Sequence, residues 1–442
     1  QPGSRWYVAT ATRRHVPEDA LSRASWNTAT IIVSRYLNLG FLAAGVFVLM
    51  SASARGVSET FAVFLLPVSK EFGWTRAEAA SVYALGMLFL GIFSPVAGKL
   101  FDKFGPRLLF PLGMACLASG PLLASQLTVL WHFYFCLSLF VGFGAAALGI
   151  AVQSALLARW FQQSLTTAVA VVSGAAGVGV MIFSPVAQAF IDELGWRHAY
   201  ASIGIIVCCV GLIVLIAPWR RIAEGRPDLR RHRPLTGKEL NTDWTFATAV
   251  RSRPYWALSA VHFLTAISMF AVQPQVVAFL VEHGTDPVTA ANAFGVSGIS
   301  ATCGLLIFGI IADRYGALLS VTLSYSLTIL GYILLFIMLV RPSNFVLWAF
   351  VISYGASFGS RGPVISALTA RIFGRGPDLG LIMGAIFMCM GTGAAVGATM
   401  GGLIHDLTDG YIFVIAWSLT AICIPVLIFW TIPELKRAAL RR

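Results

Sequence analysis

Two charged residues lie inside an apolar stretch of the sequence, where a membrane would surround them. Arg55 and Glu59 interrupt the run GFLAAGVFVLMSASARGVSETFAVFLLPV, which extends from Gly40 to Val68. At about 1.5 Å of rise per residue, Arg55 would lie roughly 22 Å from the Gly40 end of a helix, near the middle of a bilayer. An arginine at that depth is costly unless it faces protein or water, and such residues commonly mark functional sites. We therefore expect Arg55 to line an internal cavity.

A second arginine, Arg361, interrupts an apolar run near the other end of the chain. A guanidinium binds a carboxylate through two parallel hydrogen bonds, and a dry cavity strengthens the attraction. Arg55 and Arg361 are therefore candidate substrate-binding residues for an organic anion. The alternative is a structural ion pair, because Glu59 follows Arg55 by one helical turn. For Arg361 the next acidic residue is the distant Asp378.

Two titratable residues in the apolar runs are candidates for proton coupling. Glu59 is buried in its run, and burial favours the protonated form whereas a neighbouring arginine favours the ionised form. The sequence leaves open whether Glu59 exchanges a proton or stays paired with Arg55. His262 is the second candidate, because an imidazole changes charge in the physiological range. A lone histidine near a helix end is also commonly a hydrogen-bonded packing residue.

Uncharged polar residues add further candidates for substrate contact. Gln273 and Gln275 flank Pro274, which removes a backbone donor and bends a helix. Their amides either satisfy the freed carbonyl groups or reach a ligand. Gln153 and Tyr354 are polar residues in two other apolar runs. We predict that these glutamines and this tyrosine contribute to the substrate site.

Composition places all of these residues in a polytopic membrane protein. The 442 residues are 57% hydrophobic and 11% charged, and we find twelve apolar runs between positions 40 and 432. If both termini are cytoplasmic, 25 of the 31 Lys and Arg residues fall on the cytoplasmic side. This distribution follows the positive-inside rule, so the net charge of +12 sets topology and we expect no nucleic-acid partner.

Several chemistries have no motif in this sequence. The seven cysteines lie in apolar runs without C-x-x-C spacing, so we interpret them as small apolar side chains. We find no Walker loop, no G-x-G-x-x-G and no H-E-x-x-H motif. We therefore expect no cofactor, no metal site and no enzyme activity.

The two halves of the chain repeat one another. The segment GKLFDKFG at Gly98–Gly105 is echoed by GIIADRYG at Gly309–Gly316, and QSALLARWF at Gln153–Phe161 is echoed by ISALTARIF at Ile365–Phe373. The offsets of 211 and 212 residues indicate duplication of a six-helix unit in parallel orientation. We predict an all-α polytopic membrane protein with twelve transmembrane helices in two parallel-repeat six-helix bundles.

The repeat and the charge distribution also predict domain boundaries. We place the two bundles at residues 39–219 and 254–433, joined by a basic cytoplasmic loop at 220–253. Residues 1–38 are polar and contain five arginines, so we expect a disordered cytoplasmic tail without a cleavable signal peptide. Residues 434–442 would form a second, short cytoplasmic tail.

The repeated segment also carries a family resemblance. GKLFDKFGPR at Gly98–Arg107 resembles the signature of the loop between spans 2 and 3 in the major facilitator superfamily, and Gly309–Gly316 resembles its second copy. In that family the loop residues tie the cytoplasmic helix ends together in one conformation and release them in the other. The resemblance implies a gating motif made of Gly98, Asp102, Gly105 and Arg107, with Asp313 and Arg314 in the second copy.

A narrower resemblance comes from FAVFL at Phe61–Leu65 followed by EFGWTR at Glu71–Arg76. These segments are similar to those of bacterial relatives of the monocarboxylate and oxalate–formate carriers. The resemblance implies two bundles that rock about a central cavity lined by spans 1, 4, 7 and 10, and a monomer in the bacterial inner membrane. One feature departs from these families: related sequences often have an arginine near the position of Leu305 in span 8. Arg55 and Arg361 are the candidates to replace it.

Together these observations predict a secondary active transporter. It would move a small organic anion, a carboxylate, by alternating access, with proton coupling as a further hypothesis. Two alternatives stay open. One is an efflux pump for amphipathic drugs, and the other is a membrane sensor that does not transport and signals through residues 220–253.

Overall fold

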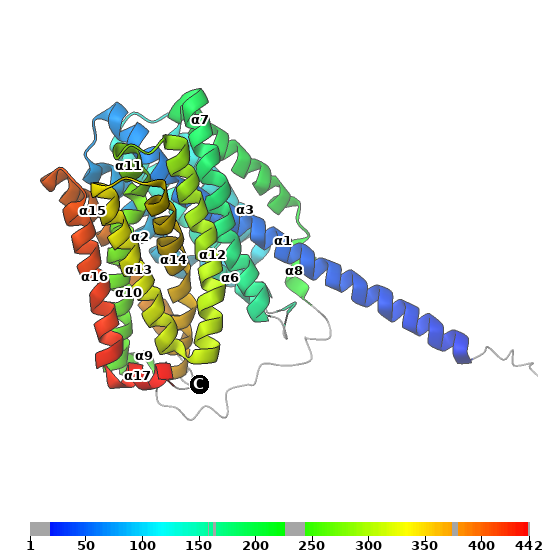
Figure 1. Ribbon diagram of the computed structural model, residues 1–442. Helices are drawn as coiled ribbons and strands as arrows, with labels where there is room; N and C mark the ends of the chain where they lie inside the picture. Colours follow the sequence, from blue (N-terminus) through cyan, green and yellow to red (C-terminus); the bar gives the residue numbers. More distant parts are fainter. Residues whose placement is uncertain (1–17, 158, 162–164, 226–243, 374–378, 441–442) are drawn as a thin grey trace, which may run out of the picture.

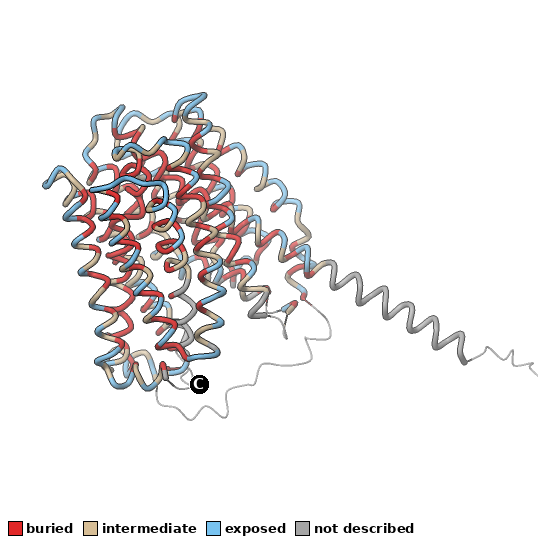
Figure 2. The backbone as a smooth tube through the Cα atoms, viewed as in Figure 1, coloured by how far each residue is buried: buried red, intermediate tan, exposed pale blue. Residues whose placement is uncertain are grey.

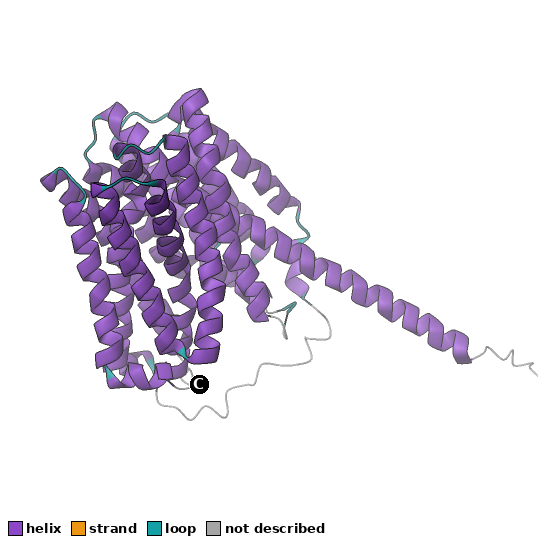
Figure 3. Ribbon diagram, viewed as in Figure 1, coloured by secondary structure: helices purple, strands orange, loops and turns teal. Residues whose placement is uncertain are grey.

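A computed structural model shows a helical protein that is built like a membrane protein. It describes residues 18–157, 159–161, 165–225, 244–373 and 379–440, and these segments contain no strand (Figure 3). Within them, ten helices are long and apolar enough to cross a membrane. The helix Ala168–Ile216 contains two spans, because Gly195 interrupts it with a φ of 79°, and Asn344–Gly359 is a shorter apolar helix. The described residues thus provide the twelve spans that hydropathy predicts.

The first six spans form the N-terminal half, in which the fourth span is irregular. A π-helix in this span places the Ser138 hydroxyl 2.7 Å from the carbonyl oxygen of Val82, to which it donates. The span is then interrupted at Leu148 and Gly149 before it continues. The elements of this half are α1 (Glu18–Phe72), α2 (Arg76–Phe104), α3 (Pro106–Ala124), α4 (Leu130–Phe133), η1 (Tyr134–Val141), α5 (Gly142–Ala147), α6 (Ile150–Leu157) and α7 (Leu165–Ile216).

The last six spans form the C-terminal half, and its first span is broken where the sequence places Pro274. The ring of Pro274 cannot donate a backbone hydrogen bond, and a short 3₁₀ turn, η3, replaces the α-helix there. The elements are α10 (Arg253–Val272), η3 (Gln273–Gln275), α11 (Val276–Glu282), α12 (Pro287–Tyr315), α13 (Ala317–Val340), α14 (Asn344–Phe373), α15 (Leu379–Thr408) and α16 (Ile412–Thr431).

The repeated sequence segments have equivalent places in the two halves. GKLFDKFG ends α2 and GIIADRYG ends α12, and each helix stops at a glycine with positive φ, 71° at Gly105 and 99° at Gly316. Glycine reaches this conformation without a Cβ clash, so both helices end sharply and the next helix starts at once. The starts are also capped, since Thr75 and Glu78 form a capping box on α2 and Asp286 caps α12.

Three expected loop or tail segments contain helix. Residues 1–38 were expected to be disordered, but α1 already begins at Glu18, because no glycine or proline interrupts positions 18–39. Residues 1–17 lie outside the described part. The expected loop at 220–253 contains most of α8 (Trp219–Glu224) and all of α9 (Phe246–Val250), and its middle is not described. The C-terminal tail forms α17 (Pro433–Leu440), an amphipathic helix that buries Leu435 and Ala439.

The two halves meet mainly through two helix pairs, α2 with α15 and α7 with α12. We call the end of the molecule that holds α9 and α17 the α17 face and the opposite end, where α2 begins, the Arg76 face. In Figure 1, α6 and α8 of the N-terminal half lie apart from α9 and α17 of the C-terminal half. Figure 2 colours residues by burial and shows exposed residues along the outside of the bundle. Many of the exposed residues are large and apolar, as expected for a surface that faces lipid.

The contact between α7 and α12 depends on glycine. A Cβ added to Gly177 would collide with the carbonyl oxygen of Gly298 and with the Thr302 hydroxyl. We expect Gly177→Ala to force the two helices apart and to lower the free energy of unfolding by about 1–3 kcal/mol. Thermal unfolding of the purified protein would measure this. Gly45→Ala on α1 is the control, because nothing lies within 4 Å of its Cβ. Equal melting temperatures for the two variants would contradict the prediction.

Candidate functional site

A cavity of about 250 Å³ lies between the two halves, and six of the expected site residues line it. Its wall comes from α1 and α7 on one side and from α10, η3, α12, α14 and α15 on the other. Among the described residues, two arginines and one glutamate are its charged lining residues, and much of the remaining wall is apolar. The expected residues that line it are Arg55, Glu59, His262, Gln273, Tyr354 and Arg361.

Arg361 is a buried cation surrounded by neutral groups. The residue is 4% exposed, and its guanidinium donates to the hydroxyls of Ser324, at 3.2 Å, and of Thr328. It also contacts the sulfur of Met269 at 2.9 Å and stacks over the ring of Tyr325, with Cζ 4.6 Å from the centroid. Among the described residues no carboxylate forms an ion pair with it. Within the described residues no counter-ion therefore balances the charge of this guanidinium, although its surroundings have a low dielectric.

Arg55 differs from Arg361 because it already has a counter-ion. Its guanidinium lies 2.8 Å from Glu59, the residue one turn further along α1, and 5.5 Å from the ring of Phe358 on α14. The Arg55 side chain is 28% exposed, whereas the Glu59 side chain is 2% exposed. The guanidinium therefore faces the cavity, and the carboxylate lies behind it.

The Glu59 carboxylate connects the two halves. It accepts hydrogen bonds from the Tyr83 hydroxyl of α2, at 3.1 and 3.2 Å, and from the Gln273 amide of η3 at 3.3 Å. The broken helix thus presents a polar side chain from the C-terminal half to a charge in the N-terminal half. Any change in the charge of Glu59 would alter a contact between the halves.

His262 and Tyr354 complete the expected residues in the cavity wall. His262 is 4% exposed, its Nε2 atom has no hydrogen-bond partner among the described residues, and its ring packs 5.1 Å from that of Phe387. Tyr354 donates to the carbonyl oxygen of Met269 at 2.9 Å. The Tyr354 hydroxyl therefore fixes α14 against α10, and its ring forms part of the wall.

Two other predicted substrate-contact residues, Gln153 and Gln275, are not among the residues that line the cavity. Their side-chain amides instead form hydrogen bonds at helix breaks. Gln153 accepts from Ser51 at 3.1 Å and donates to the carbonyl oxygen of Leu148 at 2.6 Å, where span 4 is interrupted. Gln275 donates to the carbonyl oxygen of Ala271 at 3.1 Å, next to Pro274. Both amides satisfy backbone groups that a regular helix would have paired.

The expected gating motif falls at the ends of α2 and α12. Gly98 and Asp102 lie in the last turns of α2, Gly105 ends it, and Arg107 is exposed in the first turn of α3. Asp313 and Arg314 end α12, and Arg314 is exposed. The side chains of Asp102 and Asp313 lie outside the described part, so their gating role stays a prediction.

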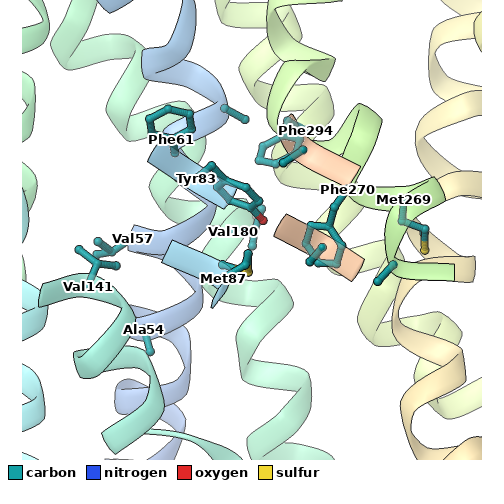
Figure 4. Close-up of a cluster of buried hydrophobic side chains, with 14 of the residues drawn as sticks. Ala54, Val57, Phe61, Tyr83, Met87, Val141, Val180, Met269, Phe270 and Phe294 are labelled. Atoms are coloured by element: carbon teal, nitrogen blue, oxygen red, sulfur yellow. The ribbon is translucent and has the colours of Figure 1, made fainter. Parts of the chain in front are cut away.

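Aromatic side chains separate the cavity from the Arg76 face. Figure 4 shows Phe61 and Tyr83 of the N-terminal half opposite Phe270 and Phe294 of the C-terminal half. The ring centroid of Tyr83 lies 6.0 Å from that of Phe61 and 6.1 Å from that of Phe270. These residues are each less than 10% exposed, so they form an apolar barrier beside Glu59.

Beyond this barrier a polar cluster, which we call the Arg76 cluster, joins the halves at the Arg76 face. The guanidinium of Arg76 pairs with Glu282 at the end of α11. Asp406 of α15 accepts from the backbone N–H groups of Arg76, at 2.9 Å, and Ala77, at 2.7 Å, at the start of α2. A carboxylate at a helix N-terminus satisfies free donors and the positive end of the helix dipole.

Tyr411 supports this cluster from the start of α16. Burial raises the pKa of its phenol, so the hydroxyl stays protonated and donates to Glu282 at 3.1 Å. The backbones also approach closely, because a Cβ on Gly402 would lie 2.7 Å from Cα of Ala77. The Arg76 face is therefore closed by charge, hydrogen bonds and backbone contact together.

Sequence reasoning missed this cluster and most of the Arg361 environment. Asp406 and Arg76 are 330 positions apart, and no periodicity joins them. One usable signal was present in the sequence. Arg76, Glu282 and Asp406 carry opposite charges and all fall at helix ends on the same predicted side of the membrane. For Arg361, the serine and threonine one turn apart on α13, Ser324 and Thr328, gave a weaker signal.

A bundle of apolar helices around a central charged cavity, closed at one end, is the architecture of a membrane transporter. The comparisons with known proteins agree. The sequence model of the Major Facilitator Superfamily matches residues 41–360 and 258–441 of this chain. The chain therefore belongs to that family. It is a multi-pass membrane protein.

Its relatives include carriers of animals and bacteria. Over 82% of its length the chain is 26% identical to monocarboxylate transporter 13 of Bos taurus, of which it covers 82%. It is 24% identical to the MFS-type transporter YcxA of Bacillus subtilis (strain 168), over 81% of this chain and 86% of that protein. The resemblance to monocarboxylate carriers that the sequence indicated is confirmed.

Two solved structures share the fold. A crystal structure of the nucleoside transporter NupG gives a TM-score of 0.68 at 15% identity, and covers 89% of this chain and 99% of that one. A bacterial homologue of the human lysosomal transporter Spinster gives 0.65 at 15% identity, over 91% of this chain and 95% of that one. At this identity the likeness concerns the fold alone.

Proposed function

We propose that this chain is a secondary active transporter for a small organic anion, a carboxylate. The observation that carries the proposal is Arg361, a buried guanidinium in the central cavity without a carboxylate partner among the described residues. Burying such a charge costs free energy. A carboxylate ligand would offset that cost and form charge-assisted hydrogen bonds with the guanidinium fork.

The position of the two arginines favours alternating access. Arg55 belongs to the N-terminal half and Arg361 to the C-terminal half, so an anion between them would draw the halves together. The Arg76 cluster closes one face, and the positive-inside distribution supports a cytoplasmic position for the α17 face. We infer a cytoplasm-facing conformation of a monomer in a bacterial inner membrane.

Glu59 is our candidate for proton coupling. Its carboxylate is held by Arg55, Tyr83 and Gln273, so protonation would weaken both the ion pair and a contact between the halves. A proton on Glu59 would also leave Arg55 free to bind the anion. Binding of the proton and binding of the anion would then favour one another.

Uptake into proteoliposomes tests the proposal. We expect labelled small carboxylates to accumulate when an inward proton gradient is applied, and uptake to fall when an ionophore removes the gradient. Empty liposomes and protein with Arg361→Gln are the controls. Uptake that does not depend on the proton gradient would contradict the coupling hypothesis but would still support a carboxylate carrier.

An efflux pump for amphipathic drugs is the second candidate, and the apolar wall of the cavity favours it. Met269, Phe270, Phe358, Phe387 and Met390 all line the cavity, and such flexible or aromatic side chains bind varied apolar ligands. The same proteoliposomes, challenged with neutral and cationic lipophilic compounds, separate the two functions. Transport of these compounds, insensitive to Arg361→Gln and without any carboxylate uptake, would favour the pump.

A further inference from the structure

The charges that line the cavity are not balanced. Glu59 lies 2.8 Å from Arg55 and neutralises it, whereas the contacts of Arg361 among the described residues are hydroxyls, a sulfur and an aromatic ring. His262, the other basic side chain in the wall, forms no ion pair with a carboxylate among the described residues, and its Nε2 atom has no hydrogen-bond partner there. With His262 neutral, the described lining carries one net positive charge.

We propose that Glu59, in the ionised form that pairs with Arg55, limits the ligand of the site to one negative charge. This inference rests on the proposed function and concerns the same cavity. A ligand with a single carboxylate balances Arg361. A second carboxylate would find Arg55 already occupied by Glu59 and would be buried without a cationic partner, which is strongly unfavourable.

The placement of Glu59 suits this role. The carboxylate is 2% exposed and lies behind the guanidinium of Arg55, which is 28% exposed and faces the cavity. Loss of the Glu59 charge would therefore free a cation that a ligand already reaches. Tyr83 and Gln273 hold the carboxylate in place from two other elements, so Arg55 cannot simply draw it toward a ligand.

The two arginines are also connected through one stretch of α14. Arg55 packs on the ring of Phe358, at 5.5 Å, and Phe358 precedes Arg361 by three residues on α14. Residues three apart on a helix are neighbours on one face. If Arg55 were unpaired, both cations would therefore be available to the two ends of a short dicarboxylate.

Glu59→Gln tests the inference, because glutamine keeps the size and a hydrogen-bond acceptor but removes the charge. We would measure equilibrium binding to the purified full-length protein by isothermal titration calorimetry, with butanoate and butanedioate as a pair of equal chain length. Binding is the readout because Glu59 is also the coupling candidate, and transport would mix the two roles. We expect the Kd ratio of butanedioate to butanoate to fall about tenfold or more relative to wild type.

A second variant, Arg55→Gln, should move the ratio in the opposite direction. It leaves the Glu59 charge without its partner, so the lining has no net positive charge and the dianion is disfavoured further. The double variant Arg55→Gln with Glu59→Gln removes both charges and should restore the wild-type preference for the monoanion. Glu71→Gln, on the same helix but paired with Arg197 outside the cavity, should leave the ratio unchanged.

The outcomes separate this inference from the proposed function. Unchanged ratios in Glu59→Gln and Arg55→Gln, with butanoate still bound and dependent on Arg361, would overturn the charge-counting role and leave the carboxylate carrier standing. Wild-type protein that binds butanedioate as tightly as butanoate would also overturn it. Binding of either anion that survives Arg361→Gln at full affinity would instead overturn the proposed function itself.

Discussion

Arg361→Gln is expected to weaken carboxylate binding by about 100-fold or more and to abolish uptake, while the protein remains at least as stable as wild type. The loss in binding is expected because this guanidinium is the cation of the cavity that has no carboxylate partner among the described residues. Truncation of a buried charged contact commonly costs about 2–5 kcal/mol, and each 1.4 kcal/mol corresponds to about a tenfold change in Kd. Stability is spared because removing this charge also removes its burial cost and leaves no orphaned carboxylate behind.

This combination distinguishes a binding arginine from a structural one. A residue that is kept to bind a ligand at the expense of folding gains stability when it is neutralised. Thermal unfolding and calorimetric binding would be measured on the same preparations. Arg341→Gln is the matched control, because Arg341 is exposed at the end of α13, away from the cavity. A large drop in melting temperature with Arg361→Gln would mean that the arginine serves the fold.

Asp406→Asn is expected to open the Arg76 face. The carboxylate accepts two hydrogen bonds from the start of α2, and both cross between the halves. An asparagine keeps one acceptor oxygen but loses the charge that complements the helix N-terminus. Hydrogen bonds to charged groups contribute about 1.5–3 kcal/mol each, so the equilibrium between the two conformations should shift by about tenfold or more.

Distances between spin labels placed at the Arg76 face on α2 and α15 would measure this shift. Glu71→Gln is the control, since Glu71 also pairs with an arginine at this face, Arg197, but both residues belong to the N-terminal half. We expect a longer distance population with Asp406→Asn and a wild-type distribution with Glu71→Gln. Identical distributions for wild type and Asp406→Asn would show that the Arg76 cluster does not hold the face closed.

Much of the fold was readable from the sequence because its physical causes are local. Hydropathy over about twenty residues decides whether a helix spans a membrane, and glycine and proline mark its ends and breaks. The break at Pro274 and the equivalent glycines, Gly105 and Gly316, were visible as residue types. The helical content before Gly40 was missed, because polarity was taken as a sign of disorder although no residue in positions 18–39 prevents a helix.

The candidate site was readable only in part. Arg55, Glu59 and Arg361 were identified because a charge in an apolar run is expensive wherever it points, and the pairing of Arg55 with Glu59 was one of two options left open. The glutamines show the limit of that reasoning. Gln153, Gln273 and Gln275 have the same side chain in similar surroundings, yet two satisfy broken helices and one reaches Glu59.

The sequence by itself determined the class of the molecule: the spans, the duplication, the basic loops and the buried charges. These depend on the preference of each residue for lipid, water or a helix. The tertiary structure alone decided which charges meet. It left Arg361 among neutral groups and set Asp406 on the start of α2, 330 residues away in the chain. Such pairings depend on how whole helices pack, and no local property of the chain encodes them.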